Sequence, residues 1–186
     1  LAARDLVDHE GQLALVMDLV RGGQTLLGLM ERDWPTGLPL VDALTVFLRI
    51  VSGVAYLHER GVIHGDLKPE NVLVEGELRT PRAWSPRVTD FGTVALIADP
   101  VTIDGRAAVV ASPRYASPEH LLGVDQLDQR SDIHGLGLLL HWLVSGRHAS
   151  GARSVEEAAE VVQQPIDLTR IVDQPEPVLD LIRTAT

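Results

Sequence analysis

Hydrophobic and polar positions near the start of the chain follow the pattern of a β-hairpin. Residues 13–20 read LALVMDLV, a short and nearly continuous apolar run, with Gly11 before it and Gly22 after it. An apolar run of this length between turn residues is typical of a buried strand. The apolar pair at residues 6–7 lies on the other side of the turn. The pattern therefore predicts a buried strand over residues 13–20, with a hairpin partner at residues 6–7.

Two later segments carry apolar residues at the spacing of a helix. Between residues 40 and 60 the apolar positions recur at intervals of three and four, and Gly61 follows where a helix C-cap belongs. Residues 132–145 read DIHGLGLLLHWLVS and are followed by Gly146. We expect the first segment to form one long, largely buried helix and the second to lie at the centre of the core.

Shorter patterns predict the remaining elements. Residues 71–74 and 87–89 are β-type runs joined by a polar segment with prolines, which predicts a hairpin with an extended loop. Ser154 and Glu157 have the spacing of a capping box, so a helix should begin there, and residues 176–186 should form another. No internal repeat or linker divides the chain. Together these patterns predict one α+β domain made mostly of helix and loop.

Composition narrows the possible classes of function. The chain has 186 residues, of which 45% are hydrophobic and none is cysteine, so it can bury a core but cannot form a disulfide. Its formal net charge of −10 argues against nucleic-acid binding, which calls for clustered Lys and Arg. No apolar run approaches the roughly 20 residues of a membrane-spanning helix. We expect a cytoplasmic domain without a nucleic-acid partner or a membrane segment.

Four polar side chains form a set suited to phosphoryl transfer. Asp66, Lys68 and Asn71 lie in one predicted loop and offer a carboxylate, a cation and an amide oxygen. Asp90 supplies a second carboxylate across the predicted hairpin. Phosphoryl transfer needs metal ions that bridge the phosphates, a carboxylate at the attacking hydroxyl and neutralisation of charge, and Mg²⁺ prefers hard oxygen ligands. The set is therefore complete for metal-assisted phosphoryl transfer.

Four motifs around these residues resemble those of eukaryotic-like, or Hanks-type, Ser/Thr protein kinases. Residues 64–71 (HGDLKPEN) resemble the catalytic loop H-R-D-L-K-P-E-N, and residues 90–92 match D-F-G. Residues 117–119 (SPE) are similar to A-P-E, and residues 131–137 (SDIHGLG) are similar to the pattern S-D-x-x-x-x-G. The motifs occur in the family's order, and the resemblance covers nearly the whole chain.

The resemblance implies a protein kinase-like fold and a division of the chain into two parts. Residues 1–20 would be N-lobe strands and the hinge, and residues 21–186 would be the helical C-lobe, truncated in its late helices. The Gly-rich loop, the phosphate-pairing Lys and its Glu partner would precede Leu6. We therefore expect a fragment of a kinase domain that is inactive on its own and only marginally stable.

Carried over residue by residue, the resemblance implies a site for ATP and Mg²⁺. Asp66 would accept the proton of the substrate hydroxyl, and Lys68 would steady the transferred phosphoryl group. Asn71 and Asp90 would hold Mg²⁺. The partners would be ATP and a protein substrate with Ser or Thr, because Lys68 stands at a position where tyrosine kinases differ.

The resemblance also implies residues that bind the nucleotide. Met17 would be the gatekeeper at the end of the strand that leads to the hinge. The backbone of Asp18 and of Val20 would bond the adenine, and Leu73 would pack beneath the ring.

Five further residues would support this site in the same way. His64 and Phe91 would belong to the hydrophobic spine that aligns the loop, and Asp132 would accept backbone N–H groups of the loop from below. Ser112, in a segment SPRY that resembles G-T-P-x-Y, would belong to the substrate-binding loop. Glu119 would close the activation segment, although the Arg that pairs with it in the family would follow the end of this chain.

One residue departs from the catalytic-loop motif. Gly65 replaces the Arg of H-R-D, which in the family pairs with a phosphorylated residue that orders the activation loop. We therefore expect activity that does not depend on phosphorylation at Thr93 or Thr102.

Simpler interpretations exist for single residues and for the whole chain. Asp66 or Asp90 alone could be a turn residue, and Asp132 could be an acid favoured by a helix N-terminus. Three histidines lack ligand partners at metal-binding spacing and are read as core or surface residues, namely His134, His141 and His148. For the chain, a pseudokinase that binds or scaffolds without turnover and a small-molecule kinase of the same fold are the alternatives. A V-A-I-K-like strand upstream of Leu1 would favour catalysis.

Overall fold

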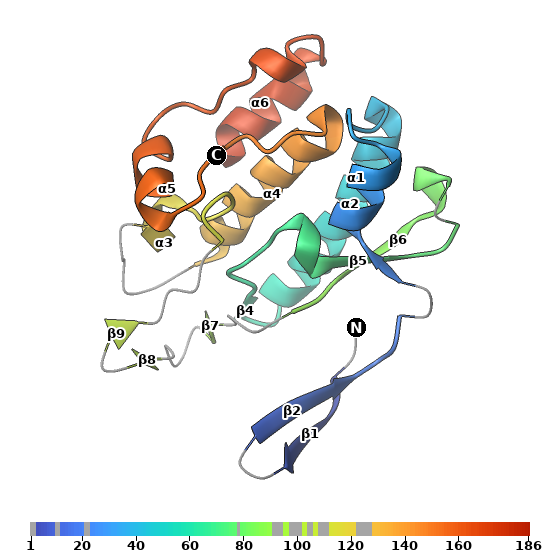
Figure 1. The fold of residues 1–186 in the computed structure, drawn as a ribbon, viewed down its shortest axis with the longest axis vertical. Coiled ribbons are helices and arrows are strands. Elements are labelled where there is room, and N and C mark those ends of the chain that lie inside the picture. Colours follow the sequence, from blue (N-terminus) through green and yellow to red (C-terminus); the bar gives the residue numbers. More distant parts are fainter. Residues whose placement is uncertain are drawn as a thin grey trace.

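Helices form the body of the molecule, and the small antiparallel β3–β5–β6 sheet lies alongside α1 and α2 (Figure 1). The computed structural model describes residues 3–9, 12–20, 23–77, 79–90, 95–96, 102–103, 106–107, 112–121 and 128–186. The helices are α1 Leu26–Asp33, α2 Leu40–His58, α3 Pro118–Leu121, α4 Gln129–Ser145, α5 Val155–Val161 and α6 Glu176–Ala185, with single 3₁₀ turns at Pro69–Asn71 (η1), Pro81–Ala83 (η2) and Thr169–Ile171 (η3).

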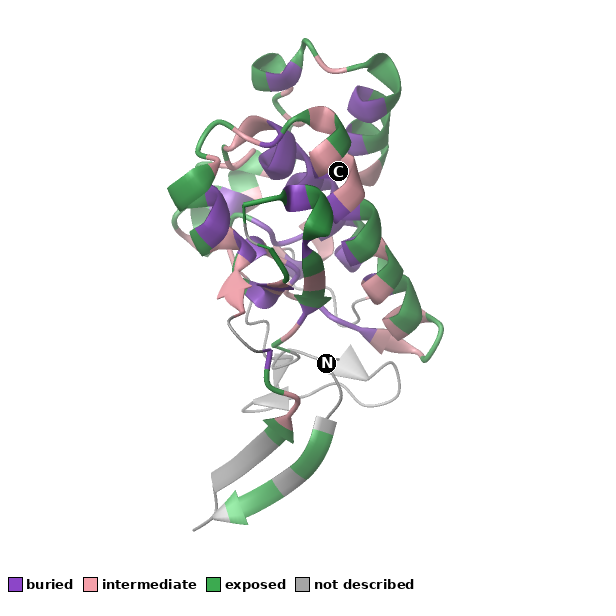
Figure 2. Cartoon of the chain, turned by 90° about the vertical axis from the view of Figure 1, so that its right-hand side faces the viewer, coloured by how far each residue is buried: buried purple, intermediate pink, exposed green. Residues whose placement is uncertain are grey.

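The core is centred on α4, which packs against both α2 and α6. Residues 131–144 of α4 are buried except for Ile133, which confirms the expected central position (Figure 2). Helix α2 was expected to be largely buried, but it buries one stripe, Ala43, Val46, Phe47, Ile50 and Val54. Its other side is exposed, for example at Leu48, because the neighbouring elements cover only the stripe.

Contrary to the expectation that no segment approaches the length of a membrane-spanning helix, α2 has the length and composition of one. Its 19 residues have a mean hydropathy of 1.8, and 28% of that span is buried inside the fold. The core helix of a water-soluble protein passes the same test, and the apolar stripe of α2 is used here to contact α4 and β6. Length and composition therefore do not decide whether such a helix spans a membrane or lies in the core of a water-soluble protein.

The ends of α4 are determined by its capping residues and by close packing. The helix begins three residues before the expected start, because Oδ1 of Asp128 accepts a hydrogen bond of 2.7 Å from the backbone N–H of Arg130. It ends at Gly146, which has φ +66°, as the sequence predicted. A Cβ atom at Gly137 would lie 2.8 Å from Cβ of Ala185, so this glycine lets α6 approach α4 closely.

Short antiparallel strands complete the structure. The predicted hairpin is confirmed as β5 Val72–Glu75 and β6 Ser85–Val88, with Val72 opposite Val88, and β3 Gln24–Thr25 pairs with the other edge of β5. The remaining pairs are β1 Ala3–His9 with β2 Gln12–Met17, β4 Val62–Ile63 with β7 Ala95–Leu96, and β8 Thr102–Ile103 with β9 Arg106–Ala107.

The β1–β2 hairpin confirms the expected pairing but not the expected burial. Strand β2 ends at Met17 rather than at residue 20, and Val7 and Val16 are 42% and 43% exposed. In Figure 1 the hairpin extends away from the helices. Among the described residues these two strands pair only with each other, so no third strand extends this sheet.

Candidate functional site

One buried carboxylate on α4 holds the loop that carries the predicted catalytic residues. Oδ2 of Asp132 accepts a hydrogen bond from the backbone N–H of His64, and Oδ1 accepts one from the backbone N–H of Gly65, both at 2.9 Å. Asp132 is 1% exposed. A buried carboxylate is tolerated only with such donors. The structure therefore gives Asp132 the contacts that the sequence assigned to it, and Gly65 adopts φ +77°, a conformation that favours glycine.

His58 is a third partner of Asp132 that sequence reasoning missed. Its Nε2 atom lies 2.7 Å from Oδ2 of Asp132, and His58 is the last residue of α2. Because the carboxylate can only accept, Nε2 of His58 is the donor. The start of the loop is thus fixed by side chains from both central helices.

The predicted catalytic residues meet within hydrogen-bond distance. Nζ of Lys68 donates to Oδ2 of Asp66 at 2.5 Å and to Oγ of Ser112 at 2.6 Å. Nδ2 of Asn71 donates to the backbone oxygen of Asp66 at 2.8 Å and to its Oδ2 at 3.1 Å. Asp66 and Lys68 are 12% and 19% exposed in their side chains, so their ion pair is only partly shielded from solvent. The Asp66 carboxylate, which can accept a proton, is therefore held beside the Lys68 ammonium group, which also contacts the Ser112 hydroxyl.

His64 links this loop to the strand that leads to Asp90. The backbone N–H of Asp66 donates to Nδ1 of His64 at 3.2 Å, so Nδ1 carries no proton, and Nε2 donates to the carbonyl of Thr89 at 3.0 Å. His64 is fully buried, in agreement with the expected structural role. Asp90 follows with φ +61°, a left-handed conformation uncommon outside glycine. Phe91, the expected partner of His64 in the spine, lies outside the described residues.

The residues expected to hold Mg²⁺ have the required ligand chemistry. Both hydrogen bonds of the Asn71 amide to Asp66 use its nitrogen, so the amide oxygen is directed away from these contacts. The backbone N–H of Thr89 donates to the carbonyl of Asn71 at 2.9 Å, which brings Asp90 to the same end of the β5–β6 hairpin. Amide and carboxylate oxygens are hard ligands, and Mg²⁺ usually completes its shell with water and phosphate oxygens. The donor set therefore fits this ion.

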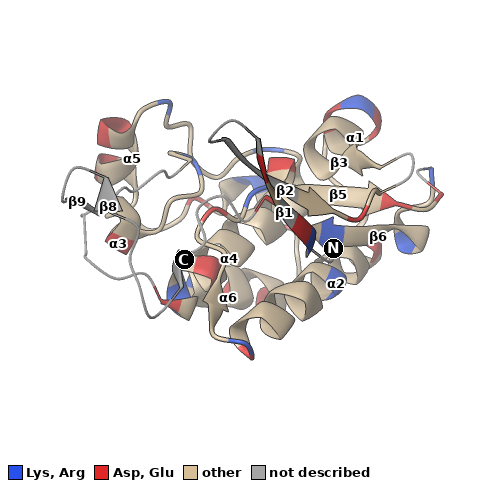
Figure 3. Ribbon diagram, turned by 90° about the horizontal axis from the view of Figure 1, so that it is seen from below, with Lys and Arg blue, Asp and Glu red and all other residues tan. Residues whose placement is uncertain are grey.

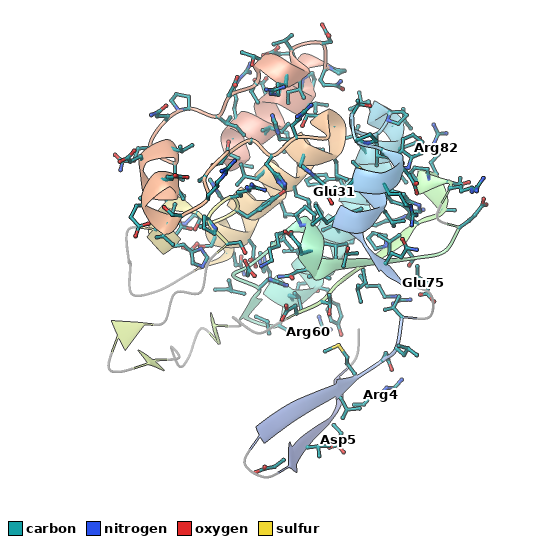
Figure 4. All side chains as sticks on the ribbon, viewed as in Figure 1. Arg4, Asp5, Glu31, Arg60, Glu75 and Arg82 are labelled. Carbon is teal, nitrogen blue, oxygen red and sulfur yellow. The ribbon has the colours of Figure 1, made fainter. Side chains whose placement is uncertain are left out.

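The residues expected to bind a nucleotide lie on two neighbouring segments. Oγ1 of Thr89 lies 3.9 Å from the sulfur of Met17, so the end of β2 reaches the residue before Asp90. The side chain of Asp18 pairs with Arg4 at 2.5 Å on the hairpin, where Figure 4 labels Arg4. Val20 is buried, and Leu73 lies on β5 opposite Thr25 and Arg87. The structure brings Met17 near the site, and the binding roles of these four residues stay predictions.

Comparison with known proteins identifies the family. A sequence profile described as protein kinase domain matches residues 2–183. The chain belongs to this family. It is 39% identical over 146 residues to the Ser/Thr-protein kinase pkn3 of Myxococcus xanthus, covering 74% of the chain and 25% of that protein. It is 38% identical over 161 residues to the Ser/Thr-protein kinase PkaA of Streptomyces coelicolor, covering 87% of the chain and 28% of that protein.

The chain is also similar to a mycobacterial Ser/Thr-protein kinase. The chain is 31% identical over 158 residues to the Ser/Thr-protein kinase PknF of Mycobacterium tuberculosis, covering 82% of the chain and 32% of that protein. The chain thus spans between about 15% and 32% of the length of such relatives. Its mixture of helices with small antiparallel sheets is the kinase-like fold that the motifs implied.

Glu119 of the kinase domain has a local partner that the sequence did not indicate. Oγ of Ser131 donates to its Oε1 at 2.5 Å. Burial alone would raise the pKa of the Glu119 carboxyl, but hydrogen bonds from Ser131, from its own backbone N–H and from Ser117 outweigh burial and lower this pKa. The end of the activation segment is therefore joined to the first turn of α4, next to Asp132.

Of the three histidines that the sequence assigned to packing, His148 contacts a tyrosine and a tryptophan. Nδ1 of His148 lies 2.9 Å from the hydroxyl of Tyr115, and its ring stacks on Trp142 with centroids 6.1 Å apart. Burial lowers the pKa of His134, of His141 and of His148. His148 therefore supports the segment after Ser112 through Tyr115, a contact that the sequence did not indicate.

Proposed function

We propose that the full-length protein transfers the γ-phosphoryl group of ATP to Ser or Thr hydroxyls of protein substrates with the help of Mg²⁺. The observation that carries this proposal is the chain of contacts from Asp66 through Lys68 to Ser112, at 2.5 and 2.6 Å. A Lys that touches both the carboxylate and the hydroxyl of the substrate-binding segment is suited to an incoming Ser or Thr. The names of the similar Ser/Thr kinases support the same acceptor class.

Each residue has a role that follows from its contacts. Oδ2 of Asp66 would orient the acceptor hydroxyl and take its proton, while Lys68 would offset negative charge at the transferred group. Asn71 and Asp90 would hold Mg²⁺, which when bound neutralises charge on the phosphates. The backbone after Met17 would bind the adenine, with Leu73 beneath it. His58 and Asp132 act through the loop and are positioning residues.

Phosphorylation of casein and histone by the full-length protein with Mg²⁺-ATP tests this proposal. We expect transfer to Ser and Thr, identified by phosphoamino-acid analysis, and a loss of at least about 100-fold in kcat for Asp66→Asn, because the variant lacks the general base. Asp173→Asn, at an exposed position, removes the same charge and should behave like the wild type. ATP binding without turnover in the wild-type protein would instead indicate a pseudokinase, and equal rates for Asp66→Asn would remove Asp66 from its assigned role.

A further inference from the structure

A surface depression lies beside Ser112. It is lined by Glu70, Ser112, Pro113, Arg114, Tyr115, Ala152 and Arg153. Since Oγ of Ser112 accepts a hydrogen bond from Lys68, one end of the depression adjoins the proposed position of the acceptor hydroxyl. A substrate peptide bound at Asp66 would therefore lay neighbouring residues across this surface.

Two arginines give the depression an excess of positive charge. Arg114 and Arg153 are exposed, and neither forms an ion pair within the part of the chain that the structure describes. Arginines elsewhere, such as Arg82 and Arg130, pair with carboxylates. Glu70 is the acidic residue of the lining, so it offsets one of the two positive charges. Figure 3 shows Lys and Arg positions dispersed over several elements of the described chain.

Hydrogen bonds hold the backbone at or next to each of the two arginines. The N–H groups of Tyr115 and Ala116 donate to the carbonyl of Ser112 at 2.8 and 3.0 Å, and the Tyr115 side chain is buried against His148. The N–H of Arg153 donates to Oε2 of Glu157 at 2.8 Å, just before α5. Burial raises the pKa of Tyr115, the charge of Glu70 raises it further, and the charge of Arg114 lowers it. Glu70 and Arg114 therefore both lie near the Tyr115 hydroxyl.

We propose that Arg114 and Arg153 select protein substrates with an acidic side chain close to the phosphorylated Ser or Thr. This inference rests on the proposed function and specifies its substrate class. An extended peptide advances roughly 3.3–3.6 Å per residue, so an acidic residue within about four positions of the acceptor can reach the depression. Because the lining has a net positive charge, an aspartate there should be favoured over alanine and a lysine disfavoured.

A peptide panel with the full-length protein tests the inference. Each peptide carries one Ser, and Asp, Ala or Lys is substituted in turn at the four positions on either side. We expect kcat/KM for Asp to exceed that for Ala by about three- to fivefold at one or more positions, the range of exposed ion pairs, and to lose this advantage at high salt. The double variant R114Q/R153Q should bring the Asp/Ala ratio close to one. Arg147→Gln, an exposed arginine outside the depression, should keep the wild-type ratio.

The outcomes separate the two proposals. Equal rates for all peptides, or an unchanged Asp/Ala ratio in R114Q/R153Q, would overturn the selection of acidic substrates and leave Ser/Thr phosphorylation intact. A higher kcat/KM for the Lys peptides than for the Ala peptides would show that Glu70 determines the selection. This result would also overturn the selection of acidic substrates. No transfer to any peptide, to casein or to histone would overturn the proposed function itself, and the inference with it.

Discussion

Nε2 of His58 lies 2.7 Å from Oδ2 of Asp132, the same oxygen that accepts the backbone N–H of His64 at 2.9 Å. His58 ends α2, and Asp132 lies in the first turn of α4. The contact therefore joins the two central helices at the point where the catalytic loop begins. Hydrogen bonds to a charged group are among the stronger ones in proteins, so this pair should matter for both folding and loop geometry.

Replacing His58 with Phe should lower both stability and turnover. The variant leaves the buried carboxylate of Asp132 without one donor, which costs about 1–3 kcal/mol and should lower Tm by several degrees. We expect kcat to fall while KM for ATP changes little, because the substitution would move the loop and not the segments proposed to bind the nucleotide. Thermal unfolding and steady-state kinetics on the full-length protein measure both effects.

The conservative variant His58→Gln provides the control. Its amide N–H can still donate to Asp132, so most of the lost stability and turnover should return. Wild-type stability and kcat in His58→Phe would show that the contact has no positioning role.

Local sequence patterns were sufficient for the long helices and for short elements with a capping or turn signal, such as α5 and the β5–β6 hairpin, and were insufficient for α1. Helix α4 was predicted because its dense apolar run ends at Gly146. Helix α1 was not anticipated, since its eight residues are too few for the apolar spacing to repeat, and its N-cap, Thr25, bonds Gly28 without the acidic residue of a capping box. The exposure of Val16 on β2 depends on which elements pack around it, and a local sequence pattern does not show this.

In the candidate site, residues that are close in the sequence were predicted, and contacts between distant residues were missed. The motifs identified Asp66, Lys68 and Asn71 because these residues lie within one loop, and the structure brings them together. His58 was missed because its partner is 74 residues away, and neither residue carries a local signal of the other. The Ser131–Glu119 bond was missed for a similar reason, because Glu119 was assigned a partner after the end of the chain.

Activity should not depend on phosphorylation of the activation segment. Gly65 stands where an Arg would pair with the phosphorylated residue, so no guanidinium is available at that position. The double variant T93A/T102A of the full-length protein, and the wild-type protein after phosphatase treatment, should keep at least about half of the wild-type kcat. A tenfold loss at unchanged Tm would show that phosphorylation acts through another cation. Thr93 and the side chain of Thr102 lie outside the described residues, so this expectation rests on Gly65.

Ser131→Ala should destabilise the kinase domain in a pH-dependent way. The hydrogen bond from Ser131 helps to hold the pKa of Glu119 below its ordinary value of 4.5. A carboxyl whose folded pKa is depressed adds stability above its unfolded pKa and loses it as pH falls through the folded pKa. The variant should therefore lose about 1–2 kcal/mol near neutral pH, and the difference from wild type should shrink below pH of about 4.5. Urea unfolding from neutral pH to below pH of about 4.5 measures this difference in the free energy of unfolding.

Ser52→Ala is the matched control for this prediction. Oγ of Ser52 donates to the carbonyl of Leu48, a group that does not titrate, so any loss of stability should be the same at every pH. A pH-independent difference for Ser131→Ala as well would contradict the role given to Glu119.

Gly146→Ala should be strongly destabilising, whereas Gly151→Ala should not. Gly146 has φ +66°, and a Cβ atom there would lie 2.6 Å from the backbone nitrogen of Gly37, where the turn after α1 contacts the end of α4. The left-handed conformation costs an alanine about 1–2 kcal/mol, and the clash with backbone adds to this cost because no side chain can move aside. A Cβ atom at Gly151 meets nothing within 4 Å. Thermal unfolding should therefore show a Tm loss for Gly146→Ala alone, and similar Tm values for the two variants would mean that the turn can shift away from α4 at little cost.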